Sequence, residues 1–158
     1  MGTIWCRQRF AVPLIIDYDI ECITGSNINL ILCADIPGGD LLGSTAERTG
    51  AYAEYQRFPN YIATYLMDGN NRTRVRFRRN PGFELLAETN VDAPIEPGMP
   101  MHIQIELNSA GALILRRDGA ELHRCQIDSP VLPGGYVGLR TWNTSLVYRR
   151  FAVSAESA

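Results

Sequence analysis

Apolar and polar residues alternate with a period of two along most of the chain, and this pattern is typical of half-buried β-strands. In the clearest stretch, MHIQIELN at 101–108, every second residue from Met101 to Leu107 is apolar and the residues between them are polar. Strands are also predicted at 14–22, 28–34, 61–68, 72–79, 135–142 and 146–154. No stretch of ten residues has a convincing amphipathic helical pattern, so the chain is predicted to be nearly all strand.

Turn-forming residues separate these stretches, and Asp118-Gly119 joins two of them as a two-residue hairpin turn. The one long connection, residues 35–60, exceeds a hairpin loop and is expected to be functional or to carry a short helical turn. We predict about nine or ten antiparallel strands in one domain, 1–158, with an all-β fold of the two-sheet jelly-roll type.

Charge and motifs exclude several classes of function. The net charge is −2, which argues against general nucleic-acid binding. No stretch approaches the roughly 20 apolar residues of a membrane span, so no membrane partner is expected. The first ten residues do not resemble a signal peptide, which predicts a cytoplasmic location. The chain has no GxGxxG, phosphate loop or nucleophile elbow, and we expect no cofactor.

The cysteines are scattered and form no CxxC pair, which favours buried free thiols over disulfides. They are Cys6, Cys22, Cys33 and Cys125. Asp35 and Asp40 share a turn that could bind calcium, but it lacks the ligand spacing of a dedicated calcium loop. We therefore predict no metal site.

Four motifs occur in order along the chain: IWCRQRFAVPLIIDYDIE at 4–21, RTGAYAEY at 48–55, RRNPGFELL at 78–86 and GGYVGLRTWNTSLVYRRFAV at 134–153. Their sequence resembles the YesU-like family of uncharacterised bacterial proteins, which has the concanavalin A-like lectin/glucanase jelly-roll fold. The resemblance implies a link to bacterial use of plant polysaccharides, particularly pectin-type glycans, and supplies no catalytic residues. The relatives begin earlier than this chain, so either an edge strand is missing or a partner covers that edge, which leaves a homodimer open.

Arginines occupy alternate positions of the strand predicted at 72–79: Arg72, Arg74, Arg76 and Arg78. Residues on one face of a strand lie about 6.6–6.8 Å apart, so the four guanidinium groups would line roughly 20 Å of groove. Such a row suits the carboxylates of an acidic oligosaccharide. The alternative is a solvated face that pairs with Asp17, Asp19 and Glu21 on a neighbouring strand.

The acidic triplet DYDIE at 17–21 has a second interpretation, because it resembles the E-x-D-x-E catalytic strand of jelly-roll glucanases. Asp17 and Glu21 would then be the carboxylates of a glycoside hydrolase. A shared surface face is the plainer explanation.

The segment ERTGAYAEY at 47–55 is the strongest site candidate, because it places aromatic and charged residues in a long connection of a rigid sandwich. Arg48 and Tyr55 are predicted to bind sugar, and Tyr52 and Glu54 are candidate catalytic groups. The alternative is that Arg48 and Glu54 stabilise the loop while the tyrosines belong to the core. Trp5 and Trp142 either pack or form a stacking platform.

His102 lies on the polar face of its strand and is a candidate general base of a polysaccharide lyase, in which an arginine would neutralise the uronate carboxylate. A solvent-exposed histidine is the alternative. We therefore predict a protein that recognises or processes acidic, pectin-like oligosaccharides. Hydrolase, lyase, purely binding and structural or assembly roles all remain open.

Overall fold

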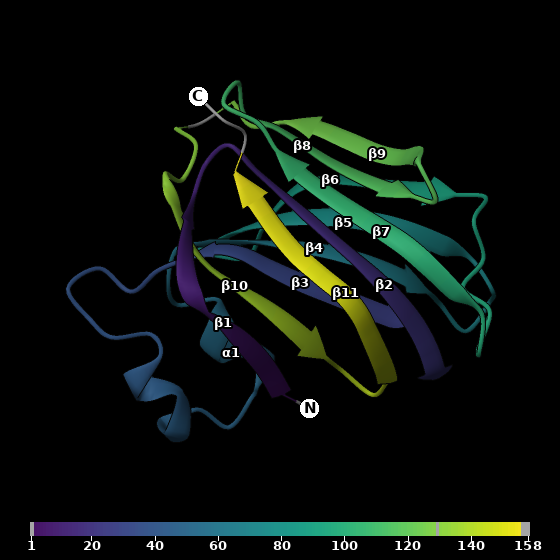
Figure 1. Cartoon of the computed structure of the whole chain (residues 1–158), viewed down its shortest axis with the longest axis horizontal. Helices are drawn as coiled ribbons and strands as arrows, with labels where there is room; N and C mark the ends of the chain where they lie inside the picture. The colour runs from purple at the N-terminus through teal and green to yellow at the C-terminus, as the bar shows by residue number, and fades with distance from the viewer. Residues whose placement is uncertain (1, 129, 156–158) are drawn as a thin grey trace.

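The computed structural model describes residues 2–128 and 130–155, which form a sandwich of two antiparallel sheets (Figure 1). The six-stranded sheet contains, in spatial order, β1 (Gly2–Ala11), β10 (Gly134–Thr141), β3 (Asn27–Ala34), β4 (Asn60–Met67), β5 (Thr73–Asn80) and β6 (Glu84–Val91). The five-stranded sheet contains β11 (Ser145–Ala155), β2 (Leu14–Thr24), β7 (Pro100–Leu107), β8 (Ala112–Arg117) and β9 (Ala120–Gln126). The predicted all-β jelly-roll class is confirmed.

The main core lies between the sheets and is built from the alternate apolar residues that the sequence pattern indicated. On β2, Leu14, Ile16, Tyr18 and Ile20 are fully buried. On β7, every second side chain from Met101 to Leu107 belongs to the core. Val75 and Phe77 of β5 face the same core, while the arginines that alternate with them point outward. Strand geometry thus explains the spacing of the arginines.

Eleven strands are present among the described residues, so the expectation of nine or ten was too low. The two strands that periodicity did not identify are β1 and β6, which form the edges of the six-stranded sheet. Neither strand contains a fully buried residue, and alternation is therefore weak in both. The hairpin through Asp118-Gly119 is confirmed, since it joins β8 to β9.

The connection between β3 and β4 folds back over the outer face of the six-stranded sheet. It contains a short 3₁₀ helix (Gly43–Glu47) and a single helical turn, α1 (Tyr52–Tyr55). A second, smaller core forms beneath it, where Tyr55 and Phe58 pack on Ile31 of β3 and Ile62 of β4. The connection thus covers one part of the outer face and leaves the neighbouring part open. Among the described residues, no helix is long and apolar enough to cross a membrane.

Two asparagines attach this connection to the sheet. The Nδ2 of Asn60 donates hydrogen bonds of 2.8 Å to the backbone carbonyls of Tyr55 and Phe58. The Nδ2 of Asn80, on the next strand, donates to Oδ1 of Asn60 at 2.9 Å. Both asparagines are completely buried, so these polar groups have no access to water as an alternative partner.

The substitution Asn60→Ala is expected to lower the free energy of unfolding by at least about 2 kcal/mol, because it leaves two carbonyls and one amide buried without partners. Urea unfolding followed by circular dichroism measures the change. Asn90→Ala, at an exposed position of β6, is the matched control and should change stability by less than about 0.5 kcal/mol. Equal effects of the two substitutions would contradict the role assigned to Asn60.

Candidate functional site

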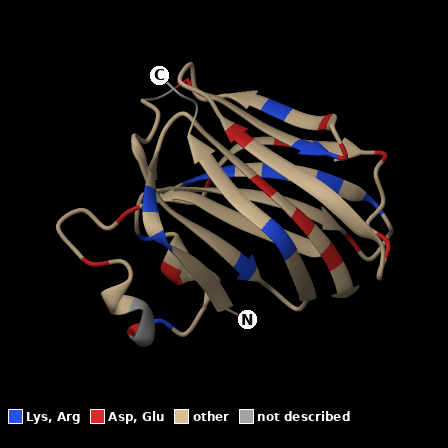
Figure 2. Ribbon diagram, viewed as in Figure 1, with Lys and Arg blue, Asp and Glu red and all other residues tan. Residues whose placement is uncertain are grey.

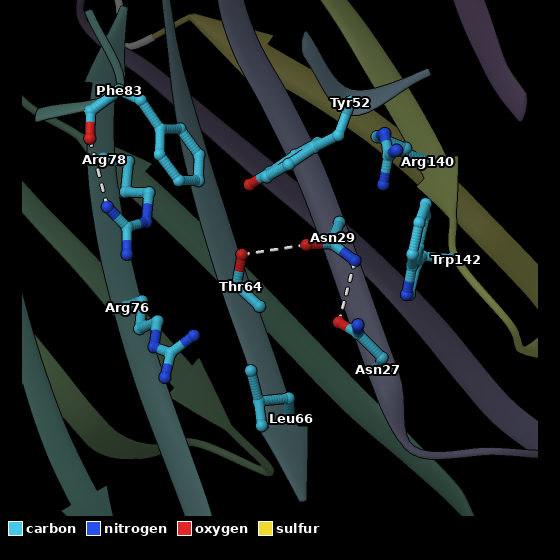
Figure 3. A pocket seen from close by; sticks show the side chains of 10 residues that line it. All are labelled: Asn27, Asn29, Tyr52, Thr64, Leu66, Arg76, Arg78, Phe83, Arg140 and Trp142. Atoms are coloured by element: carbon cyan, nitrogen blue, oxygen red, sulfur yellow. Dashed lines mark hydrogen bonds between the residues drawn. The ribbon is translucent and has the colours of Figure 1, made fainter. Parts of the chain in front are cut away.

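A pocket of about 210 Å³ is hollowed into the open part of the outer face of the six-stranded sheet (Figure 3). Strands β3, β4, β5 and β10 supply its floor and sides, and three connecting segments supply the rest. The lining residues are Asn27, Asn29, Tyr52, Thr64, Leu66, Arg76, Arg78, Phe83, Arg140 and Trp142. The set combines aromatic rings, amides and guanidinium groups.

The floor of the pocket is one cross-strand row. Strand pairing places Arg140 opposite Asn29, Asn29 opposite Thr64, and Thr64 opposite Arg76. The Thr64 hydroxyl donates to Oδ1 of Asn29 at 2.8 Å, and Nδ2 of Asn29 donates to Oδ1 of Asn27 at 2.8 Å. These bonds hold the middle of the floor in one arrangement, so the site is preorganised.

Two aromatic rings from different loops form a wall of the pocket. Tyr52 belongs to α1, and Phe83 follows the Asn80-Pro81-Gly82 turn after β5. Their rings meet edge to face with centroids 5.0 Å apart. The backbone N–H of Phe83 donates to Oδ1 of Asn80 at 3.0 Å, which fixes the turn. Burial raises the pKa of Tyr52, although the nearby guanidinium charges oppose this effect.

Arg140 is the most unusual residue of the site, because its side chain is only 2% exposed. Its guanidinium carbon lies 4.4 Å from the ring centre of Tyr52, 5.4 Å from that of Tyr55 and 5.6 Å from that of Trp142. Its Nη2 donates a long bond of 3.4 Å to the Gly50 carbonyl, and its Nε has no partner in the described structure. Burial lowers the pKa of Arg140. The aromatic rings stabilise a buried cation that has no carboxylate within 4 Å among the described residues.

The four predicted arginines of the 72–78 stretch do not act as one continuous row. Arg72 and Arg74 both form ion pairs with Asp68, and Arg76 forms one with Glu88 of β6. Arg78 instead donates to the Phe83 carbonyl at 3.1 Å and lies 4.0 Å from the centre of that ring. Only Arg76 and Arg78 line the pocket.

Pairing of these arginines with the DYDIE triplet does not occur, because the triplet lies on β2 in the other sheet. Figure 2 shows acidic residues along β2 beside arginines of β11. Asp19 accepts a hydrogen bond from Arg150, and Glu21 accepts one from Arg149 at 3.0 Å. A bulge between Arg149 and Ala152 allows two successive arginines to face this acidic strand. The triplet thus has structural partners on its own sheet, and the order of the strands could not be derived from alternation.

Residues 47–55 have two roles: one of them lines the pocket, and others hold the connection that carries it. Tyr52 lines the pocket, whereas Tyr55 is 2% exposed and belongs to the smaller core. Glu54 accepts from the backbone N–H of Thr49 at 3.1 Å, a bond that holds its pKa below the usual value, and also from the backbone N–H of Gly50. Arg48 donates to the Ser44 hydroxyl and the Leu41 carbonyl. Glu54 and Arg48 therefore fix the loop that carries Tyr52 and do not line this pocket.

His102 lies on the outer face of the five-stranded sheet, away from the pocket. Its ring nitrogens lie 3.0 Å from Oδ1 of Asp19 and 3.2 Å from Oδ1 of Asp17. Asp17 also accepts from Gln104 at 3.0 Å. The structure therefore does not bring His102 together with Tyr52 or the arginines of β5. In the described part of the chain, no group of three or more His, Cys, Asp or Glu side chains could hold a metal ion.

Sequence reasoning missed most of the pocket floor: Asn27, Asn29, Thr64 and Arg140. The signal for Arg140 was weak, since an isolated arginine in GLRTW gives no hint of burial. A better signal was present in β3, where Leu30 to Ala34 form a continuous apolar run. Such a run indicates a strand covered on both faces, and it predicts that something packs on the outer face beside Asn29.

The model of the family described as "Domain of unknown function (DUF6250)" matches residues 2–151. The chain belongs to this family. The match does not test the resemblance to the YesU-like family, and that resemblance stays a prediction. No curated protein sequence matches the chain.

Solved structures with the same fold include a Bacillus subtilis protein of unknown function described as having a galectin-like fold. The TM-score is 0.82 at 23% identity, over 96% of this chain and 76% of that one. The Bacillus subtilis carbohydrate-binding module CBM66 matches with a TM-score of 0.65 at 14% identity, and the match covers 97% of this chain and 81% of that one. A toad ovary galectin solved in complex with thio-digalactose matches with a TM-score of 0.61 at 7% identity, and the match covers 98% of this chain and 99% of that one. At these identities the likenesses establish the fold of the DUF6250 chain alone.

The charge pairing beside the pocket predicts a specific pH response. Burial would raise the pKa of Asp68, but donation from Asn70, Arg72 and Arg74 outweighs it and lowers the pKa from 3.8 to about 2. The folded state therefore favours the ionised carboxylate, and this stabilisation is present above the unfolded value and lost as the pH falls toward 2. Asp68→Asn should have a lower urea midpoint than the native chain at neutral pH, and the difference should shrink in acid. A difference that does not change with pH would contradict this assignment.

Proposed function

We propose that this protein binds an acidic oligosaccharide in the pocket on the outer face of the six-stranded sheet. The observation that carries the proposal is the pairing of an exposed ring with uncompensated cations in one pocket. Trp142 is 38% exposed at the pocket, and Arg78 and Arg140 line it without a carboxylate partner among the described residues. An acidic ligand would supply the missing negative charge.

The chemistry of the lining suits a sugar. The apolar faces of pyranose rings pack on aromatic side chains, and amides and guanidinium groups form hydrogen bonds with hydroxyls and carboxylates. Arginine is the preferred partner of a carboxylate, because its planar fork forms two parallel hydrogen bonds. We extend the proposal to pectin-type fragments, whose uronate residues carry one carboxylate each.

The lining favours binding over hydrolysis. Among the described residues that line the pocket, none is Asp, Glu or His, whereas glycoside hydrolysis ordinarily uses two carboxyl groups. Asp17 and Glu21, the candidate pair for a hydrolase, lie on the other sheet in contact with Gln104 and Arg149. Tyr52 is the one acid–base group of a lyase among the described residues that line the pocket, and its raised pKa keeps the hydroxyl protonated at neutral pH, so it is not poised to abstract a proton.

The fold neighbours support this proposal without extending it. One is a carbohydrate-binding module by name, and another was solved with thio-digalactose bound. The same two-sheet architecture therefore serves sugar binding in other proteins. The acidic preference rests on the arginines of this chain alone.

Trp142→Ala is expected to lower the affinity for trigalacturonate about tenfold, because it removes the exposed ring of the pocket. Isothermal titration calorimetry measures the affinity. Met99→Ala removes an exposed apolar side chain that does not line the pocket, and it should leave the affinity unchanged.

The same protein should bind neutral galactotriose far more weakly than trigalacturonate, and it should produce no ultraviolet absorbance of unsaturated uronates from polygalacturonate. Equal affinity for the neutral and acidic sugars would refute the charge argument. Appearance of the absorbance would show that the site is a lyase.

A further inference from the structure

Two of the three arginines that line the pocket have no carboxylate within 4 Å among the described residues. Arg76 is neutralised by Glu88, but Arg78 and Arg140 contact aromatic rings and backbone carbonyls instead. Each of the two therefore presents a positive charge that a bound anion could balance. Desolvation makes such a contact stronger at Arg140 than at a fully hydrated arginine.

These two cations lie at opposite sides of the pocket (Figure 3). Arg78 is on β5 and Arg140 is on β10, and β4 and β3 lie between them. Three interstrand spacings correspond to about 14 Å between the backbones that carry them. Arg140 is stacked on Tyr52 and Arg78 on Phe83, and these two rings contact each other between the guanidinium groups. In this arrangement Tyr52 and Phe83 separate the two guanidinium groups, and each arginine has a ring of its own.

We infer that the ligand crosses the strands and carries two separate anionic groups, one contacting Arg78 and the other Arg140. This inference rests on the proposed function and adds the direction and the charge pattern of the oligosaccharide. Between the two cations the floor offers the uncharged Asn29 and Thr64, which suit a neutral part of the ligand.

A ligand that lies along β5 instead of across the strands is disfavoured, because the other arginines of this stretch already pair with carboxylates. A ligand lying along that strand would follow Arg78, Arg76, Arg74 and Arg72. Asp68 and Glu88 already neutralise the last three, so anionic groups there would meet carboxylates. The charge that remains unbalanced thus runs across the sheet.

The test is a length series, in which calorimetry compares galacturonate with its dimer, trimer and tetramer on the native chain. The affinity should rise about tenfold or more at the length that first reaches both arginines, since one charged hydrogen-bonded contact is added there. Arg78→Met and Arg140→Met should each remove this rise and should reduce the salt dependence of binding to the longer oligomer. Methionine retains the apolar stem that packs on the aromatic rings.

Arg149→Met, on the other sheet, is the matched control and should retain the full rise. If Arg140→Met does not fold, the length series on the native chain and on Arg78→Met still decides the question. Binding of acidic oligomers with the same affinity as the monomer would overturn this inference and leave the proposed function intact. No binding of any acidic member of the series would overturn both.

Discussion

The packing of the connection between β3 and β4 on the outer face of the six-stranded sheet determines the rest of the site. Ile31 and Ile62 point away from the main core, and Tyr55 and Phe58 cover them. Without this cover, the sheet would expose two large apolar side chains and its outer face would have no wall. With it, the connection places Tyr52 beside Arg140, at one end of the polar row that contains Asn29. A second apolar core thus supports a polar pocket.

The two outer faces of the sandwich differ in how their charges are balanced. On the five-stranded sheet, Asp19 and Glu21 have arginine partners from β11. On the six-stranded sheet, the pocket retains Arg78 and Arg140 as cations held by aromatic rings. An arginine that is already neutralised by a neighbouring carboxylate attracts a further anion less strongly. The face with unbalanced charge in a preformed pocket is therefore the one suited to an acidic ligand.

The sequence predicted the fold well, because period-two alternation reports directly on which side of a strand is buried. Of the candidate site residues, Tyr52, Arg76 and Arg78 line the pocket, and their roles stay predictions. It could not predict the floor, since Asn29 and Arg140 become neighbours only through the pairing of β3 with β10, which are far apart in the chain. Strand order follows from the packing of the whole molecule, and the local pattern contains no information on it. For the same reason the local pattern could not show that Asp68 and Glu88, rather than the DYDIE triplet, pair with arginines of β5.

Binding of acidic oligosaccharides on the six-stranded face can be located residue by residue with nuclear magnetic resonance. Trigalacturonate would be titrated into ¹⁵N-labelled protein while the backbone amide shifts are followed. We expect the largest changes at the paired positions of β10, β3, β4 and β5 around Asn29 and Thr64, and at Tyr52 and Phe83. Changes centred on β2 and β7 around His102, with none in the pocket, would contradict it.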